Sequence, residues 1–215
     1  MNSLPIILMI APPILIALTF HEFAHAYIAY RLGDPTAKNS GRLTLNPLAH
    51  LDLVGTIMVF IIHIGWAKPV PVNPAYFKNP KKDTLYVSLA GPLSNIILAF
   101  IFGIMCRILN VTTLYPADLS VMEIVKFMCA FGVLINLVLA FFNIIPLPPL
   151  DGSKILMGLV PDKYNSYVEL LMRYGHFVLL GLVIMSVVFS IPIFYYLYVP
   201  FVRVFSYIFA GVSLM

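Results

Sequence analysis

The stretch LTFHEFAHAYIAY, residues Leu18–Tyr30, places two histidines and a glutamate inside a strongly apolar run. Each of these polar side chains costs free energy when it is buried away from water. The rest of the chain is also apolar, because 61% of its 215 residues are hydrophobic and only 10% are charged. A mean hydropathy of +0.96 is typical of an integral membrane protein. The polar residues of this stretch therefore need a compensating role inside a membrane.

Several apolar runs reach or approach the roughly 20 residues that cross about 30 Å of hydrocarbon. The sequence therefore predicts an all-α membrane protein, a polytopic bundle of about five to six transmembrane helices. The individual spans are predicted at residues 4–31, 84–107, 121–147, 174–191 and 193–213.

The apolar run at residues 53–67 is short for a crossing, so we expect a membrane re-entrant segment there. If this segment does not cross, the loops at 31–50, 66–83 and 151–173 share one side of the membrane. That side then carries ten basic residues against two on the other, which is the bias of a cytoplasmic face. A crossing segment would move four of the lysines and leave the comparison less decisive.

Two classes of function are not favoured by composition. Cys106 and Cys129 lie in apolar runs and lack the short spacing of a zinc or redox pair, so they are interpreted as buried small side chains. A net charge of +4 is small for a nucleic-acid-binding protein, and the basic residues lie in loops between spans. We therefore expect the lipid bilayer, and no nucleic acid, as a partner.

His21 and His25 are four residues apart, so on a helix they share a face and can direct both imidazoles at one point. The pattern His-Glu-x-x-His binds zinc through its histidines, and Glu22 is then the general base for a water molecule. The alternative is that both histidines only hydrogen-bond to neighbouring helices. Under this alternative, nothing offsets the free-energy cost of inserting ionisable groups at the centre of a spanning helix, which is roughly 2.5 to 3.5 kcal/mol for each group. With a helix end near Arg31, His21 lies about 15 Å below the surface.

A catalytic zinc needs a third protein ligand, and the candidate lies in FNIIPLPPLDG, residues Phe142–Gly152. Asp151 is the only carboxylate in this stretch, and three prolines before it cannot continue a regular helix. An unwound backbone would let Asp151 fold back toward the metal. The alternative, that Asp151 caps the following helix, stays open at this point.

Together, HEFAH and NIIPLPPLDG resemble the two signatures of the site-2 protease family. The members of that family are intramembrane zinc metalloproteases and belong to peptidase family M50. GPLSN and GWAKPVPVN are similar to segments of small bacterial and archaeal members without accessory soluble domains. The resemblance covers about residues 15–155. It implies a multi-pass protein of a prokaryotic cell (plasma) membrane, with the active site nearer the cytoplasmic face that the charge bias indicates.

The same resemblance implies one zinc ion (Zn2+) per chain, bound by His21, His25 and Asp151, with Glu22 as the catalytic base and acid. It also implies that Asn143 holds the substrate carbonyl oxygen or the developing oxyanion. From the residues alone, Asn143 could equally form a polar contact between helices.

A transmembrane substrate must unwind before hydrolysis, and an extended peptide is commonly held at a sheet edge. Gly41–Pro47 and Lys68–Pro74 have the alternation or the prolines of short edge strands, and the resemblance implies such strands beside the site. The alternative is ordinary loop structure. The candidate substrate-binding residues are Val70, Val72, Asn73 and Asn95. A packing or hydrogen-bonding role between helices is the alternative for Asn95. For His50 and His63, a structural role is preferred to gating or support of the ligands.

The sequence thus predicts an intramembrane zinc endopeptidase that cleaves a transmembrane protein or peptide substrate within or next to its membrane segments. We expect a single domain over residues 1–215, with a catalytic core at about 4–155 and additional transmembrane helices at about 174–213. The rival is a membrane metal-ion or proton transporter, which would also explain buried ionisable groups. The other predicted spans lack the chain of polar sites that conduction would favour. The sequence makes no prediction of the oligomeric state.

Overall fold

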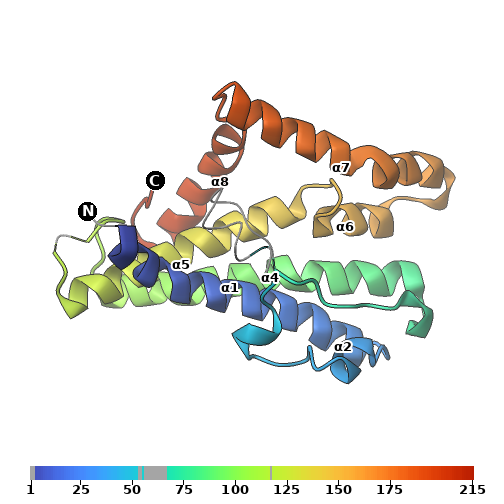
Figure 1. Ribbon diagram of the computed structural model, residues 1–215, viewed down its shortest axis with the longest axis horizontal. Coiled ribbons are helices and arrows are strands. Elements are labelled where there is room, and N and C mark those ends of the chain that lie inside the picture. The colour runs from blue at the N-terminus through green and yellow to red at the C-terminus, as the bar shows by residue number, and fades with distance from the viewer. Residues whose placement is uncertain (1–2, 53–54, 56–66, 117) are drawn as a thin grey trace.

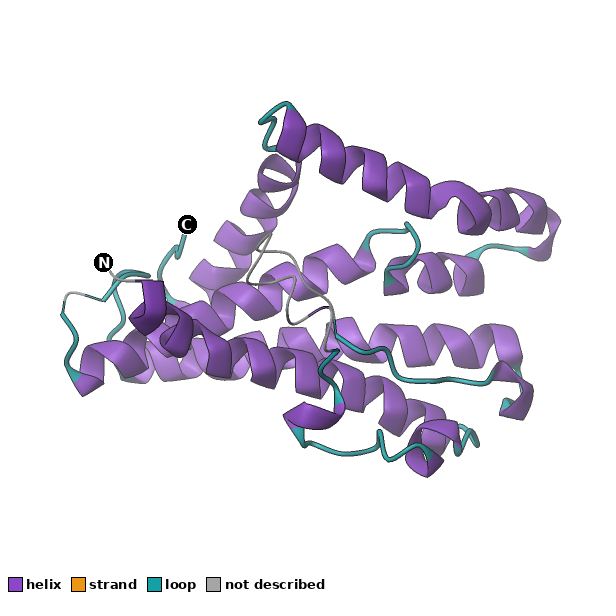
Figure 2. Ribbon diagram, in the orientation of Figure 1, coloured by secondary structure: helices purple, strands orange, loops and turns teal. Residues whose placement is uncertain are grey.

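A computed structural model describes residues 3–52, 55, 67–116 and 118–215, and within these residues it contains helices and loops but no strand (Figure 2). The long helices are α1 (Ser3–Arg31), α4 (Pro80–Ile108), α5 (Val121–Ile144), α7 (Asn165–Val188) and α8 (Ile193–Ala210) (Figure 1). The short helices are α2 (Thr36–Asn39), η1 (Pro47–Ala49), η2 (Pro74–Tyr76), α6 (Asp151–Leu159) and η3 (Asp162–Tyr164).

Five helices in the described part of the chain are long and apolar enough to cross a membrane, and they correspond to the five predicted spans. The predicted boundaries differ from the helices by three or four residues at several ends and by nine at the start of α7. α7 begins at Asn165 rather than 174, because its first turns are helical although Asn165, Glu169 and Arg173 interrupt their apolar residues. α5 ends at Ile144 rather than 147, because the prolines that follow cannot continue the helix.

The centre of the molecule is a bundle in which α4 packs against α1, α5 and α8. Its core consists largely of small side chains, which let the helix backbones approach closely. α1 ends and α4 begins at one end of the bundle, whereas α4 ends and α5 begins at the other (Figure 1). Both cysteines are buried and free in this core, as the sequence predicts. α7 lies outside the bundle and contacts only α6, η3 and α8 among the described helices.

The break between α5 and α6 determines where Asp151 lies. Residues 145–150 form a tight connection that contains a cis peptide bond between Pro148 and Pro149. α6 then begins at Asp151. A Cβ added at Gly152 would fall on the carbonyl oxygens of Ile144 and Ile145, so only glycine lets the start of α6 lie directly on the end of α5.

The prediction of short strands is not confirmed. Residues 41–47 and 68–74 lie within the described part of the chain and contain no strand; the nearest feature is one isolated antiparallel bridge between Leu51 and Ala67. Within the described part of the chain, no strand lies beside these two segments to pair with their backbone. Several of their backbone groups bond to side chains instead; for example, the backbone N–H of Asn73 donates to the carboxylate of Asp34. The predicted re-entrant segment, 53–67, lies outside the described residues except Gly55 and Ala67, and His63 lies outside them too.

Replacing Gly103 by alanine should destabilise the bundle. The added Cβ would lie 2.6 Å from the Cβ of Phe209 on α8 and 2.7 Å from its carbonyl carbon, so α4 and α8 must move apart. Overpacking of this kind costs about 1–3 kcal/mol. The free energy of unfolding in detergent micelles measures the effect. Gly181→Ala in α7 is the matched control, because nothing lies within 4 Å of a Cβ added there. Equal stability of the two variants would contradict the close packing of α4 on α8.

Candidate metal centre

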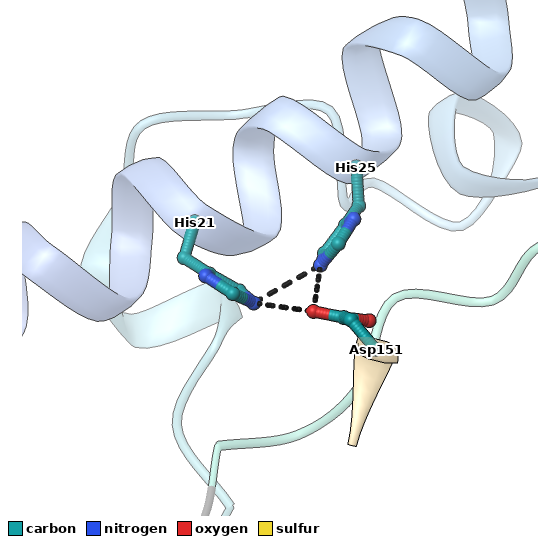
Figure 3. Close-up of side chains that lie close together, drawn as sticks. All are labelled: His21, His25 and Asp151. Atoms are coloured by element: carbon teal, nitrogen blue, oxygen red, sulfur yellow. Dashed lines mark hydrogen bonds and ion pairs between the residues drawn. The ribbon is translucent and has the colours of Figure 1, made fainter. Parts of the chain in front are cut away.

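His21 and His25 project from consecutive turns of α1 toward the carboxylate of Asp151, the first residue of α6 (Figure 3). The two imidazole Nε2 atoms lie 3.0 Å apart, and each lies 3.1 Å from Oδ2 of Asp151. The histidines are buried, at 7% and 8% exposure. Among the described residues, His21, His25 and Asp151 form a group of three side chains that could hold a metal ion, with their candidate ligand atoms all within 4.8 Å of one another. The structure thus brings together the three ligands named from the sequence.

The helix-capping alternative for Asp151 is not what the structure shows. The N-cap of α6 is Leu150, and no side chain caps the helix. The Asp151 side chain instead reaches the two imidazoles on α1, as the unwound segment before it allows.

The outer nitrogens of both imidazoles are held by hydrogen-bond acceptors. Nδ1 of His25 lies 2.7 Å from the carbonyl oxygen of Val87, and Nδ1 of His21 lies 2.7 Å from Oδ1 of Asn95. A carbonyl oxygen only accepts hydrogen bonds, so each Nδ1 carries the proton. In its neutral form, each imidazole therefore presents an unprotonated Nε2 to the centre of the triad.

This protonation pattern makes the centre a site for a cation. Two nitrogen lone pairs and a carboxylate oxygen within 3.1 Å of one another repel unless a metal ion or a proton lies between them. Four tetrahedral ligands at about 2.0–2.1 Å from zinc would lie about 3.3–3.4 Å apart, which is close to the spacing here. Nitrogen and oxygen ligands with this spacing fit zinc, and acceptors on the outer imidazole nitrogens are the usual support of such ligands.

Glu22 lies on the same helix and shares a cavity with the triad. The cavity has a volume of about 240 Å³ and is lined by residues of α1, α4, α5, α6 and the 68–74 segment. Oε2 of Glu22 accepts a hydrogen bond of 3.0 Å from the backbone N–H of Val70. This bond anchors the carboxylate next to the ligands and ties the 68–74 segment to α1.

Of the other residues named from the sequence, Asn143, Val70 and Val72 line the cavity. Asn143 donates one amide hydrogen to the carbonyl oxygen of Leu139, at 3.0 Å. Asn73 does not line the cavity, because its side chain caps η2.

Asn95 does not line the cavity either and is 0% exposed, so the structure favours the alternative role in hydrogen bonding between helices. His50 is also buried; its Nε2 donates to the carbonyl oxygen of Thr44, and Nδ1 faces Arg42, consistent with a structural role.

Several residues at the site were not named from the sequence. Gly91 packs directly on the imidazoles, because a Cβ added there would lie 2.5 Å from Cε1 of His21 and 2.5 Å from Nε2 of His25. Asn136 hydrogen-bonds to Asn95. In the sequence, the only indication of a role for Asn136 is that it is a polar amide within an otherwise apolar predicted helix. The cavity also has lining residues with no such signal, among them Thr84, Val87, Ser88 and Lys154.

Comparison with known proteins agrees with this chemistry. A model of peptidase family M50 matches residues 105–182. YwhC of Bacillus subtilis, which bears the name of a zinc metalloprotease, is 43% identical over 169 residues, or 79% of this chain and 77% of YwhC. MJ0611 of Methanocaldococcus jannaschii, similarly named, is 30% identical over 149 residues, or 69% of this chain and 66% of MJ0611.

Rip2 of Mycolicibacterium smegmatis also bears a zinc metalloprotease name and is 34% identical over 145 residues. That match covers 64% of this chain and 52% of Rip2, so the chain spans about half the length of that relative. No solved structure matches the chain significantly.

Gly91→Ala should weaken zinc binding, because its Cβ would displace both imidazoles from the positions described above. Changes to the surroundings of metal ligands typically cost about 10–100-fold in affinity, and we expect a loss of that size. Competition with a chromophoric chelator in detergent measures the zinc dissociation constant. Gly181→Ala should retain the wild-type value. A Gly91→Ala protein that binds zinc as tightly as wild type would contradict the close contact.

Proposed function

Because the chain belongs to peptidase family M50 and is a zinc metalloprotease, we propose that it hydrolyses peptide bonds within or next to the transmembrane segments of other proteins. The single observation that carries this proposal is the depth of the triad. His21 lies ten residues before the end of α1 at Arg31, which corresponds to about 15 Å along a membrane-spanning helix. A peptide bond that reaches the triad must therefore enter the membrane-embedded part of the protein.

In this proposal, His21, His25 and Asp151 hold one zinc ion per chain. When bound, zinc supplies a Lewis acid and lowers the pKa of a coordinated water to about 7. The chain fixes the ligands before zinc arrives, because the Val87 carbonyl and the Asn95 amide hold both imidazoles in the required tautomer.

Glu22 is proposed as the proton carrier. Its carboxylate takes a proton from the attacking water as the new C–O bond forms, and returns that proton to the amine nitrogen as the C–N bond breaks. Glu22 thus ends the cycle as it began. The hydrogen bond from Val70 restrains one carboxylate oxygen and leaves the other without a partner among the described residues.

Asn143 is proposed to hold the substrate carbonyl oxygen. One hydrogen of its amide is used by the Leu139 carbonyl, and the second N–H remains for an oxyanion at the cavity. The bond to Leu139 also restrains the side chain, so little ordering is needed when charge develops on the substrate.

The 68–74 segment is proposed to hold the substrate in an extended form. Val70 and Val72 line the cavity, and the prolines beside them keep the backbone out of a helix. The segment has no strand partner among the described residues, so an extended peptide could use its edge. Asn73, which caps η2, would support the segment from outside the cavity.

Family membership and the five apolar helices indicate an integral membrane protein. We propose the cell membrane of a prokaryote, because YwhC, Rip2 and MJ0611 come from bacteria and an archaeon. The predicted charge bias supports a site nearer the cytoplasmic face. The transporter alternative is not favoured. Among the described residues, a group of three metal-binding side chains occurs at the triad, and conduction would favour further such sites along the spans. Family M50 is, moreover, a family of peptidases.

Glu22→Gln should retain zinc and lose turnover by on the order of 10²–10⁴-fold, because glutamine cannot accept the proton. His21→Ala should lose both zinc and turnover. Metal content of the purified protein and cleavage of a model transmembrane substrate in proteoliposomes measure the two properties. Glu169→Gln is the matched control, because Glu169 is an exposed glutamate of α7 remote from the cavity. Normal proteolysis by Glu22→Gln, or ion flux through proteoliposomes without proteolysis, would overturn the proposal.

Val70→Pro should lower kcat and retain zinc, because it removes the N–H that holds Glu22. The neighbours Pro69 and Pro71 already favour an extended backbone, so the change acts chiefly on this hydrogen bond. A hydrogen bond to a charged group is worth about 1.5–3 kcal/mol, which corresponds to a loss of about 10–100-fold. Val70→Ala keeps the N–H and reports the side-chain contribution alone. Equal kcat values for the proline and alanine variants would show that this bond does not position Glu22.

A further inference from the structure

We infer that Asn136 on α5 is a positioning residue of the metal centre, which acts through Asn95 to hold His21 in the tautomer that binds zinc. Asn136 touches neither the triad nor the cavity. Its effect would pass through two hydrogen bonds that connect α5 to α4 and α4 to α1. The inference rests on the proposed metal site and extends it to a residue that the motifs do not include.

The hydrogen bonds form a directed chain. Nδ2 of Asn136 donates to the carbonyl oxygen of Gly132 at 2.8 Å, which leaves Oδ1 of Asn136 facing α4. That oxygen accepts a bond of 2.9 Å from Nδ2 of Asn95. Oδ1 of Asn95 then accepts the bond of 2.7 Å from Nδ1 of His21. The backbone carbonyl of Gly132 thus fixes the orientation of the Asn136 amide, which in turn presents an acceptor to Asn95.

The orientation of the Asn95 amide is what decides the tautomer. Its NH2 group donates to two acceptors, the carbonyl oxygen of Ala17 and Oδ1 of Asn136. Rotating the amide by half a turn would bring its oxygen against both acceptors and its NH2 against Nδ1 of His21. A donor at that place favours an unprotonated Nδ1 and a proton on Nε2. In that tautomer the lone pair of His21 lies on Nδ1, which faces Asn95, and Nε2 has none to offer the metal.

The burial of Asn136 supports the inference. Both Asn136 and Asn95 are 0% exposed, in helices that are otherwise strongly apolar. An amide buried without partners costs roughly 2–7 kcal/mol, so its hydrogen bonds must be satisfied. One group of Asn136 is satisfied inside α5, and its bond outside the helix goes to Asn95. Packing alone would be served by leucine, which has a similar size and no polar groups to satisfy.

Asn136→Leu therefore removes one of the two acceptors that orient Asn95. We expect its zinc dissociation constant, measured by chelator competition in detergent, to rise by about 10–100-fold. Asn136→Asp should restore affinity to within a few-fold of wild type, because a neutral carboxylic acid can donate to Gly132 and accept from Asn95. Ser206→Ala, which removes a buried hydroxyl from α8, is the control and should bind zinc as wild type does.

A second readout separates positioning from folding. The ¹⁵N chemical shifts of His21 in zinc-free wild-type protein should show a protonated Nδ1, and the Asn136→Leu protein should show a larger share of the Nε2–H tautomer. A wild-type His21 protonated at Nε2 overturns the inference even if the leucine variant fails to fold. Wild-type zinc affinity in a folded Asn136→Leu protein also overturns it. If wild-type protein binds no zinc at all, the proposed function fails instead.

Discussion

The convergence of two imidazole nitrogens from α1 and one carboxylate oxygen from α6 is the constraint on which this structure depends. The three atoms lie 3.0–3.1 Å apart in a buried place, where the low dielectric strengthens electrostatic interactions between them. Such an arrangement suits a bound cation, and the surrounding helices hold its three side chains in place. Gly91 and the hydrogen bonds to the outer nitrogens of His21 and His25 supply that support.

The same constraint explains the most irregular part of the chain. A regular helix through residues 145–150 would carry Asp151 away from α1. The prolines end α5 at Ile144, and Gly152 lets α6 begin directly on that end. Irregular backbone at membrane depth is tolerated only where protein or a wet cavity satisfies its polar groups. Here the cavity of about 240 Å³ lies beside the break, so the unwinding that brings in a ligand also leaves room for a substrate.

Local patterns predicted the parts of the fold and the site that depend on local chemistry. Hydropathy predicted the five long helices, and the four-residue spacing predicted that His21 and His25 share a face. The prolines before Asp151 predicted the break in α5. The contacts between helices were not predictable, because neither Gly91 nor Asn136 carries a local pattern that shows which residue of another helix it meets. The strands expected at residues 41–47 and 68–74 are not confirmed, because alternation and prolines indicate an extended backbone, and only a pairing partner makes it a strand.

The helices that form the candidate metal site differ from the helix that exposes the most apolar surface. Among the described residues, the printed hydrogen-bond partners of the two imidazoles come from α1, α4 and α6, and α5 adds Asn143 at the cavity and the Asn136 amide. These helices pack closely, and their polar groups face one another. α7 contributes no residue to the cavity and has a largely exposed apolar surface. Substitutions on its lipid face can therefore adapt the protein to its membrane without moving the ligands, since no described hydrogen bond connects that face to the triad.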